Sequence, residues 1–285
     1  MQKITFTNAR GDTITFSDVK PFILRTIEGT GGLDTEIRST RSPYQDGSTF
    51  ISAYVADRDI TITGYIITND IREMYALRRQ LSSLMNPKLG LGKLIYTNDD
   101  RTYAIQAVAE SSPVFSDRYV TNQAFTLSFT CPNPYWMDEQ QTTRALKYEE
   151  NGLTFPLRLP TSFAFSSYKG IFTNDGDVDT PVIIHYQGPA KNPAVINETT
   201  NKKIKVNYDL TADDVLEIST EFGNKRVEVV KGDGTRVNVF HWIDLESDFF
   251  QLVPGDNLLT YESDQEKDRE TAIVTVYWNN RYSGG

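Results

Sequence analysis

The stretch Asp59-Ile60-Thr61-Ile62-Thr63-Gly64-Tyr65-Ile66 alternates polar and apolar residues. Alternation with a period of two places the apolar side chains on one face of a β-strand, so we predict a strand with one buried face. A different period begins four residues later. Within residues 70–85, apolar residues recur at spacings of three and four, which is typical of one face of an α-helix: Ile71, Met74, Leu77, Leu81 and Leu84. The sequence therefore predicts β-structure interrupted by one helix.

The ends of this helix are marked by the residues beside it. Asn69 or Asp70 can accept hydrogen bonds from the free amides of the first turn, and Glu73 follows Asp70 at the spacing of a capping box. Asn86-Pro87 predicts the end, because proline disfavours helical geometry in the residue before it.

Towards the start of the sequence, Ile4 and Phe6 alternate with polar residues, and so do residues 14–16 after the turn at 9–12. This pattern predicts a β-hairpin. Residues 28–50, in contrast, show no clear period and are rich in Gly, Thr and Ser. So long an irregular stretch is unusual inside a compact domain, and it is typical of a functional loop, a disordered segment or an arm that packs on another subunit.

Beyond the helix, strands are predicted at 93–97 and 102–108, and residues 125–129 alternate again. The stretch Cys131-Pro132-Asn133-Pro134-Tyr135-Trp136 then interrupts the pattern. Two prolines in three residues end a strand, so we predict that a first domain covers residues 1–136.

Residues 137–160 are mixed in character and are interpreted as a connector to a second domain at 161–285. The second domain shows strand patterns only, separated by turns at 199–202, 231–235 and 254–257. Short strands at intervals of ~8–12 residues favour a β-sandwich. The predicted strands are residues 182–186, 194–197, 203–208, 215–219, 226–230, 236–240, 249–252, 257–261 and 272–278.

The composition of the 285 residues excludes several classes of function. One Cys and two His leave little for disulfides, Cys-based zinc sites or His-based chemistry. The net charge of −9 argues against a general nucleic-acid binder. Residues 1–135 carry 14 Lys or Arg and 14 Asp or Glu, so all of the net charge lies after residue 135. No apolar run approaches the ~20 residues that span a bilayer, and we expect synthesis in a reducing cytoplasm.

Motifs for nucleotide or nucleophilic chemistry are incomplete. Gly90-Leu91-Gly92-Lys93 lacks the upstream Gly of a phosphate-binding loop, and Gly29-Thr30-Gly31-Gly32 is not set in a strand–helix unit. No Gly-x-Ser-x-Gly elbow occurs in the sequence. Cys131, His185 and His241 each stand alone in a β-context, so structural roles are favoured over catalytic ones.

Patterns for metal, sugar and phosphate binding are equally weak. Residues 175–179 match the first three ligand positions of an EF-hand, but Thr180 and Tyr186 replace its Gly and its Glu. Trp242 and Trp278 are candidates for stacking on sugars, although aromatic residues on sandwich strands more often lie in the core. A solvated surface is likewise favoured over a phosphate site for the arginines of the helix, which are Arg72, Arg78 and Arg79.

Three stretches near the domain ends resemble one known family. They are the Cys131–Trp136 stretch, the run from Trp242 to Pro254-Gly255-Asp256-Asn257, and Trp278-Asn279-Asn280-Arg281-Tyr282-Ser283-Gly284. In combination they resemble the distal tail protein family of siphophages and phage-tail-like particles. The resemblance covers nearly the whole chain and is carried by Pro132, Pro134, Trp136, Trp242, Pro254, Gly255, Asp256, Asn257, Trp278, Arg281 and Tyr282.

This resemblance implies a mainly β fold with two domains. The N-terminal domain is expected to be a β-sandwich with one helix that assembles into a hexameric ring. The C-terminal domain is expected to be a galectin-like, jelly-roll type β-sandwich outside the ring. Such a ring is a structural hub of the virion tail that joins the tail tube to the tip or baseplate and lets DNA pass through its lumen.

The resemblance also implies partners. They are the tail tube protein, a tail-tip hub protein of the tail-associated lysin type and the tape-measure protein, with attachment of receptor-binding proteins left open. No catalytic residue, cofactor or metal is needed for this role. Residues 28–50 are then expected to form an inter-subunit arm that makes β-pairs in the ring, with these candidate contact residues: Asp34, Arg38, Arg41 and Tyr44.

An alternative from another class is a carbohydrate- or cell-wall-binding β-sandwich protein that acts in host adsorption. Some members of the resembled family carry a carbohydrate-binding module inserted in the second domain, but this sequence has no insertion long enough to hold one. A sandwich fold by itself does not establish sugar binding. A metal-dependent hydrolase is a third interpretation, which the scarcity of ligand residues disfavours.

Overall fold

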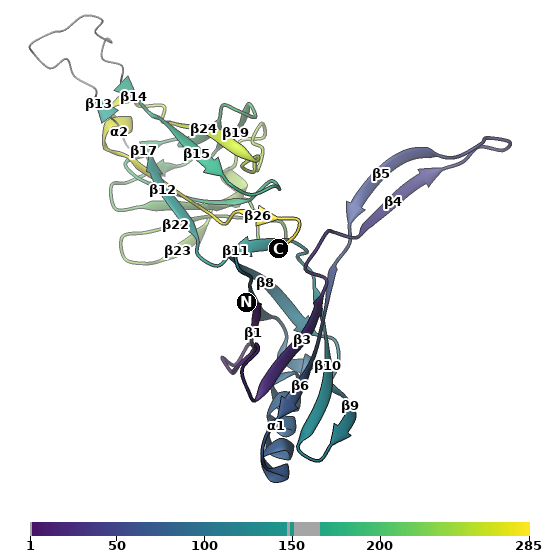
Figure 1. Cartoon of the computed structure of the whole chain (residues 1–285). Helices are drawn as coiled ribbons and strands as arrows, with labels where there is room; N and C mark the ends of the chain where they lie inside the picture. The colour runs from purple at the N-terminus through teal and green to yellow at the C-terminus, as the bar shows by residue number, and fades with distance from the viewer. Residues whose placement is uncertain (1, 147–148, 151–165) are drawn as a thin grey trace, which may run out of the picture. The chain divides into compact units, whose positions relative to one another are not determined.

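The computed structural model describes residues 2–146, 149–150 and 166–285 (Figure 1). The chain divides into two compact units: the first runs to Glu139 and includes Tyr282–Gly285, and the second comprises Gln140–Arg281. The chain therefore leaves the first unit, forms the second and returns to the first. The division falls after residue 136 because β11 (Trp136–Asp138) still pairs with β8 (Thr102–Ala109) of the first unit.

The main sheet of the first unit is antiparallel and curves round one core. Its strand order is β2 (Thr13–Phe16), β1 (Lys3–Thr7), β7 (Gly92–Thr97), β8, β10 (Asn122–Cys131), β6 (Arg58–Ile67) and β3 (Phe22–Glu28). Phe6 of β1 and Phe129 of β10 are not on neighbouring strands, yet their rings meet at 4.8 Å. The two halves of the sheet thus face each other across the core, as expected for a sandwich.

The two end strands of this sheet are also joined to each other. The Leu24 amide donates to the Ser17 carbonyl at 2.7 Å, and the Ser17 amide donates to the Phe22 carbonyl at 3.3 Å. The sheet therefore closes on itself in the manner of a small barrel. Two short strands extend it: β9 (Val114–Tyr119) pairs with β10, and β26 (Arg281–Tyr282) pairs with β11.

The predicted helix is confirmed as α1 (Ile71–Leu84), followed by the short helix η1 (Pro87–Leu89). The Asp70 side chain accepts a hydrogen bond from the Arg72 amide, so Asp70 is the N-cap. Met74, Leu81 and Leu84 are buried, and the helix packs against β2 and β6. The periodicity of the sequence thus located both the helix and its buried face.

Residues 28–50 differ from the irregular stretch that the sequence suggested. They contain β4 (Thr35–Thr40) and the start of β5 (Thr49–Val55), which pair antiparallel as a separate two-stranded sheet. We call this hairpin, residues 35–55, the ribbon. Its residues show no buried face, so burial has imposed no regular alternation on the sequence.

The second unit is a β-sandwich, in agreement with the predicted fold class. One sheet has the order β12 (Thr142–Leu146), β25 (Ile273–Trp278), β16 (Val182–Gln187), β21 (Val215–Ser219), β22 (Arg226–Val230) and β23 (Arg236–Asn238). The other has the order β15 (Lys169–Asn174), β24 (Gly255–Glu262), β18 (Ala194–Asn197) and β19 (Lys202–Lys205). Side chains from both sheets share one core, where the rings of Phe172 and Trp278 lie 5.7 Å apart.

Short elements complete the second unit. They are the pairs β13 (Glu149–Glu150) with β14 (Ser166–Ser167) and β17 (Ala190–Lys191) with β20 (Asp209–Leu210), and the helices η2 (Phe240–Trp242) and α2 (Glu266–Thr271). The helix α2 is a correction, because only strands were predicted here. The predicted strand at 249–252 is also wrong: within this range Leu252 makes a single β-bridge to Thr180, and no strand forms.

The predicted connector at 137–160 also differs from the described structure. Residues 142–146 form β12 and pair with β25, which adds them to the larger sheet of the second unit. Residues 147–148 and 151–160 lie outside the described residues.

Candidate assembly surface

The ribbon has two different faces. Directly paired residues share a face, so Ile37 and Ala53 lie on one face together with Val55, whereas Arg38 and Ser52 lie on the other. A β-bulge between Arg38 and Ser39 shifts the register by one residue. The bulge keeps Phe50, which pairs with Ser39, on the same face as Ile37. One face is therefore apolar and the other is polar.

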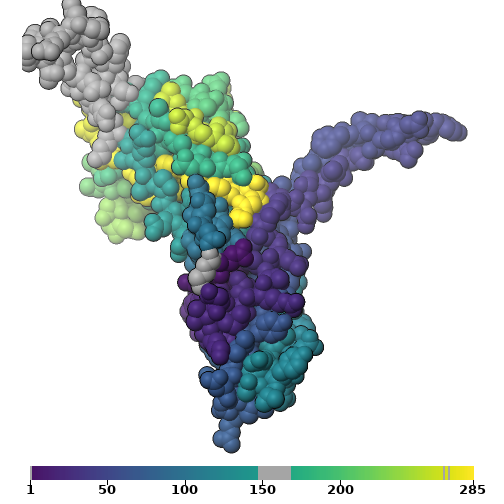
Figure 2. All heavy atoms as spheres, viewed as in Figure 1, coloured from purple at the N-terminus to yellow at the C-terminus, as the bar shows by residue number. Residues whose placement is uncertain are grey.

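The apolar face of the ribbon is open to solvent in the single chain. The exposed fractions are 68% for Ile37 and 65% for Phe50 on this face, and 61% for Ile51, which lies at the bulge. In Figure 2 the ribbon, in purple and blue, is only one hairpin thick, and no second layer covers it in that view. Adjacent exposed apolar residues are typical of interaction surfaces, which makes this face a candidate assembly surface.

The polar face and the tip hold the other predicted arm residues. The Arg38 guanidinium lies 5.0 Å from the centre of the Tyr54 ring. Arg41 Nε donates to the Gln45 carbonyl at 2.9 Å, which closes the tip loop. Tyr44 is at the tip with a φ of 65° and a fully exposed ring. Asp34 precedes β4, and its carbonyl accepts the Ala56 amide at 2.9 Å.

The base of the ribbon is held by Arg58, a buried residue at the start of β6. Its guanidinium donates to four backbone carbonyls, those of Gly29 at 2.5 Å, Gly31 at 2.8 Å, Pro134 at 2.6 Å and Ser283 at 2.6 Å. Burial lowers the pKa of Arg58, and the charges of Cys131 and Asp34 oppose that effect. A buried cation is tolerated only when it is well hydrogen-bonded, which explains the number of acceptors.

Most of the family-motif residues of the first unit surround this base. The Pro134 carbonyl is one of the four acceptors, and Trp136 is fully buried with its ring 5.8 Å from the Arg58 guanidinium. The Tyr282 hydroxyl accepts from Arg101 and donates to Asp138, both at 3.1 Å. Burial, with the Asp138 charge, raises the pKa of Tyr282 to about 12. Pro132 lies between β10 and β11.

The Pro254-Gly255-Asp256-Asn257 motif lies at the start of β24, where a bend at Pro254 leads into the strand. Gly255 has a φ of 88°, and the Asp256 carboxylate accepts the Thr173 hydroxyl at 2.6 Å. Asn257 is fully buried, and its side-chain amide donates to the carbonyls of Val253 at 2.7 Å and Gly255 at 3.0 Å. Its Oδ1 accepts the Val253 amide at 3.0 Å. The motif therefore fixes the course of the backbone into β24.

The other motif residues of the second unit are divided between core and surface. Trp278 is buried, and its indole donates to Asn280 at 3.2 Å. The Arg281 guanidinium lies 3.7 Å from the Glu221 carboxylate. Trp242, in contrast, lies on η2 with 46% of its surface exposed.

Two family models match the chain. The one described as phage tail protein RIFT-related domain matches residues 9–131, and the one described as siphovirus-type tail component, C-terminal domain, matches residues 175–282. The chain belongs to the siphovirus-type distal tail protein family. It is accordingly a siphovirus-type tail component located in the virion tail.

Solved structures of phage proteins share the fold of this distal tail protein. The crystal structure of phage SPP1 Dit, described as a paradigm of the hub adsorption apparatus in phages that infect Gram-positive bacteria, has a TM-score of 0.71 at 12% identity, with 99% of each chain covered. A chain of the phage P2 baseplate activated with Ca has a TM-score of 0.56 at 12% identity, covering 100% of this chain and 99% of that one. The same baseplate with Sr gives 0.53 at 13% identity, with 97% of each chain covered. No curated protein sequence matches the chain.

The Cys131 thiol and the His185 imidazole of this distal tail protein are each held in a structural environment. Cys131 is buried, and burial raises the pKa of its thiol to about 12. His185 lies 3.5 Å from Glu217, a carboxylate that also accepts from Arg226 and Arg236. Among the described residues, no three His, Cys, Asp or Glu side chains form a group that could hold a metal. Over the same residues, no helix is long and apolar enough to cross a membrane.

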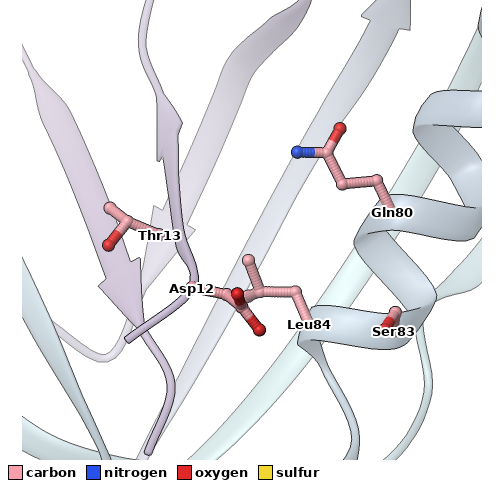
Figure 3. A pocket seen from close by; sticks show the side chains of 5 residues that line it. All are labelled: Asp12, Thr13, Gln80, Ser83 and Leu84. Atoms are coloured by element: carbon pink, nitrogen blue, oxygen red, sulfur yellow. The ribbon is translucent and has the colours of Figure 1, made fainter. Parts of the chain in front are cut away.

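Figure 3 shows a shallow hollow of about 290 Å³ between the start of β2 and the last turns of α1. Asp12, Thr13, Gln80, Ser83 and Leu84 line it. Asp12, the one ionisable residue among them, accepts a hydrogen bond from the Asn8 side chain at 3.2 Å. Because Asp12 is the one ionisable residue in this lining, the hollow offers no paired acid and base.

Arg58 is the residue that sequence reasoning missed. Arg58 stands two residues before Ile60, which stands two residues before Ile62. It therefore follows the two-residue spacing of the buried side chains in this strand. That spacing was the available indication, but an arginine in such a position is usually exposed. Its four acceptors come from three separate parts of the sequence, residues 29–31, Pro134 and Ser283, so no local pattern reveals them.

Proposed function

We propose that this distal tail protein assembles through its first unit into a hexameric ring that joins the tail tube to the tail tip or baseplate. The ring encloses a lumen through which DNA passes. Its partners are the tube protein on one side, a tail-tip hub protein of the tail-associated lysin type on the other, and the tape-measure protein inside. The protein acts by shape and symmetry and has no catalytic role.

The observation that carries this proposal is the exposed apolar face of the ribbon. A hairpin that buries no face is only marginally stable in water, so Ile37, Phe50 and Ile51 need a partner surface. In a ring, every subunit offers the same surface to its neighbour, and every ribbon can be covered at once. The charged residue Asp34 and the polar-face and tip residues Arg38, Arg41 and Tyr44 then lie at the edges of this contact, and the free edge of the ribbon is available for β-pairing.

The charge distribution supports the same function. The residues up to 135 carry equal numbers of acidic and basic side chains. A conduit that gripped the phosphate backbone would retain DNA rather than release it, so a neutral ring domain suits passage.

Native mass spectrometry and negative-stain microscopy of the purified full chain test the proposal. Rings of six copies with an open centre are the expected result, and cross-links should join residues 35–55 of one copy to the first unit of the next. A chain that stays monomeric alone and also with the tube and tip proteins present would contradict the proposal.

A second candidate function is binding of host glycans by the second unit. It is favoured by the exposed Trp242, whose ring lies 5.4 Å from that of His241 and 6.2 Å from that of Tyr208. Aromatic rings in such clusters can stack on sugar faces. Glycan-array binding that is lost in Trp242→Ala, but kept in the matched surface variant Phe222→Ala, would support this function.

A further inference from the structure

The last residues of the sequence reach the base of the ribbon. The Ser283 carbonyl accepts from Arg58 Nη2 at 2.6 Å, and the Gly285 amide donates to the Thr30 carbonyl at 2.8 Å. A Cβ added at Gly284 would lie 3.4 Å from the Gly31 carbonyl oxygen. Residues 283–285 therefore run directly beside residues 29–31, where β3 leads into the ribbon.

These residues are anchored on both sides of that contact. Tyr282, the residue before them, is held by Arg101 and Asp138. At the other end, a Cβ added at Gly285 would lie 3.3 Å from the Tyr103 ring and 3.4 Å from the Trp136 ring. The segment is thus seated in the first unit and is not a loose tail.

The base of the ribbon has few other constraints. Residues 29–32 include three glycines, and glycine loses more conformational entropy on ordering than any other residue. A Cβ added at Gly31 or Gly32 would meet no atom within 4 Å. Hydrogen bonds from Arg58 and Gly285 to the carbonyls of residues 29, 30 and 31 are what give this segment a fixed course.

We propose that Arg58 and residues 283–285 form a clasp that fixes the base of the ribbon. Arg58 is the positioning residue, because one guanidinium joins residues 29–31, Pro134 and Ser283. The chain reaches Ser283 only after the whole second unit, so the ribbon is fixed only in a chain that extends beyond that unit. A role of the clasp in assembly rests on the proposed function of the ribbon as the contact between subunits.

Hydrogen–deuterium exchange of the full chain and of a chain that stops after Tyr282 tests the clasp. Loss of the clasp bonds should make amide exchange in residues 29–34 and at Ala56 at least about tenfold faster. Exchange in β7 and β8 should not change. A second variant, Arg58→Lys, keeps the charge, but a lysine cannot donate to carbonyls in several directions at once. In the full-length chain this variant should show the same faster exchange at residues 29–34 and Ala56.

The matched control is Arg25→Lys, since Arg25 lies on β3, is exposed and donates to the Tyr65 hydroxyl at 3.2 Å. Unchanged exchange at residues 29–34 in the shortened chain would overturn the clasp. Equal acceleration in β7 and β8 would mean a general loss of the fold and would also count against it. Faster exchange at the base with an unchanged fraction of rings leaves the clasp standing and contradicts the proposed function of the ribbon instead.

Discussion

Gly29 shows how one residue can determine where an element points. It has a φ of 87°, and a Cβ at this position would lie 2.0 Å from the backbone oxygen of Asp59. Both the backbone conformation and the space require glycine here. The chain can therefore turn from β3 towards the ribbon only with this residue.

We predict that Gly29→Ala lowers the free energy of unfolding of the first unit by more than about 1 kcal/mol. Gly11→Ala is the matched control, because Gly11 has a φ of 89° but no atom within 4 Å of a Cβ. Chemical denaturation of both variants measures the difference. Equal losses would show that backbone strain alone, and not the contact with Asp59, matters at position 29.

Asn257 also determines the local course of the backbone, in this case through hydrogen bonds. Its buried side chain satisfies the backbone of Val253 and Gly255, and removal leaves those groups without partners. We predict that Asn257→Ala lowers the free energy of unfolding of the second unit by about 2–4 kcal/mol. Asn224→Ala, at an exposed turn, should cost less than about 0.5 kcal/mol. Thermal unfolding checks both, and similar losses would contradict a special role for Asn257.

The local preference of this motif could be predicted from the sequence, whereas the surroundings of Asn257 could not. The Pro-Gly-Asp-Asn stretch predicts a turn from local residue preferences, but the structure has only a bend at Pro254, and Gly255–Asn257 already belong to β24. The burial of Asn257 could not be predicted, because it depends on Phe172 and Asn197 from other strands. Arg58 was missed for the same reason.

At the scale of elements, the local sequence pattern predicted the helices and strands that have one buried face. The helix α1 and the strand β6 alternate buried and exposed residues at the periods of 3.6 and two, and the sequence revealed both. The ribbon has no buried face in the single chain and contains a bulge, so its two strands did not appear as one hairpin.

The ribbon face carries a prediction about association. Phe50→Ser and Ile37→Ser remove exposed apolar surface, so each should weaken ring formation at least about tenfold and leave the thermal midpoint of the single chain unchanged. Leu245→Ser, on a fully exposed residue of the second unit, is the control. Mass photometry over a dilution series measures the ring fraction. Wild-type association in both ribbon variants would rule out this face as the contact.

The larger sheet of the second unit carries a prediction about pH. Burial acts to raise the pKa of Glu217, but the hydrogen bond and charge of Arg226 and the charge of Arg236 outweigh burial and hold that pKa below its ordinary value. A carboxyl with a lowered folded-state pKa stabilises the fold above its unfolded-state pKa of ~4.5, and this stability is lost as the pH falls through the folded-state value.

Denaturation of the second unit between pH 7 and pH 3 should therefore show a loss of stability on the acid side that Glu217→Gln reduces. The control Glu246→Gln removes a carboxylate from an exposed ion pair with Lys203 and should behave as the wild type does. An acid loss of the same size in Glu217→Gln would assign the effect to other groups.

At the scale of the whole molecule, the first unit is discontinuous in sequence. Its sheet is complete only when Tyr282 returns to it after the second unit. The sequence predicted two β domains from strand spacing and the family from its motifs. The return could not be predicted, because residues 282–285 are too short a segment for any periodicity to show which unit they join.

The distribution of charge leads to a prediction about DNA. The first unit is neutral up to residue 135, and the remaining residues carry the net charge of −9, so neither part of the sequence has a net excess of the cations that release counterions from DNA. We therefore expect the assembled protein to bind duplex DNA with a dissociation constant weaker than ~100 μM at ~0.15 M salt, although DNA passes through the proposed ring. Fluorescence anisotropy with a labelled duplex measures this, and a basic protein of similar size is the positive control. Tight binding that weakens steeply with salt would place a cationic surface on the ring and contradict a conduit that lets DNA slide through.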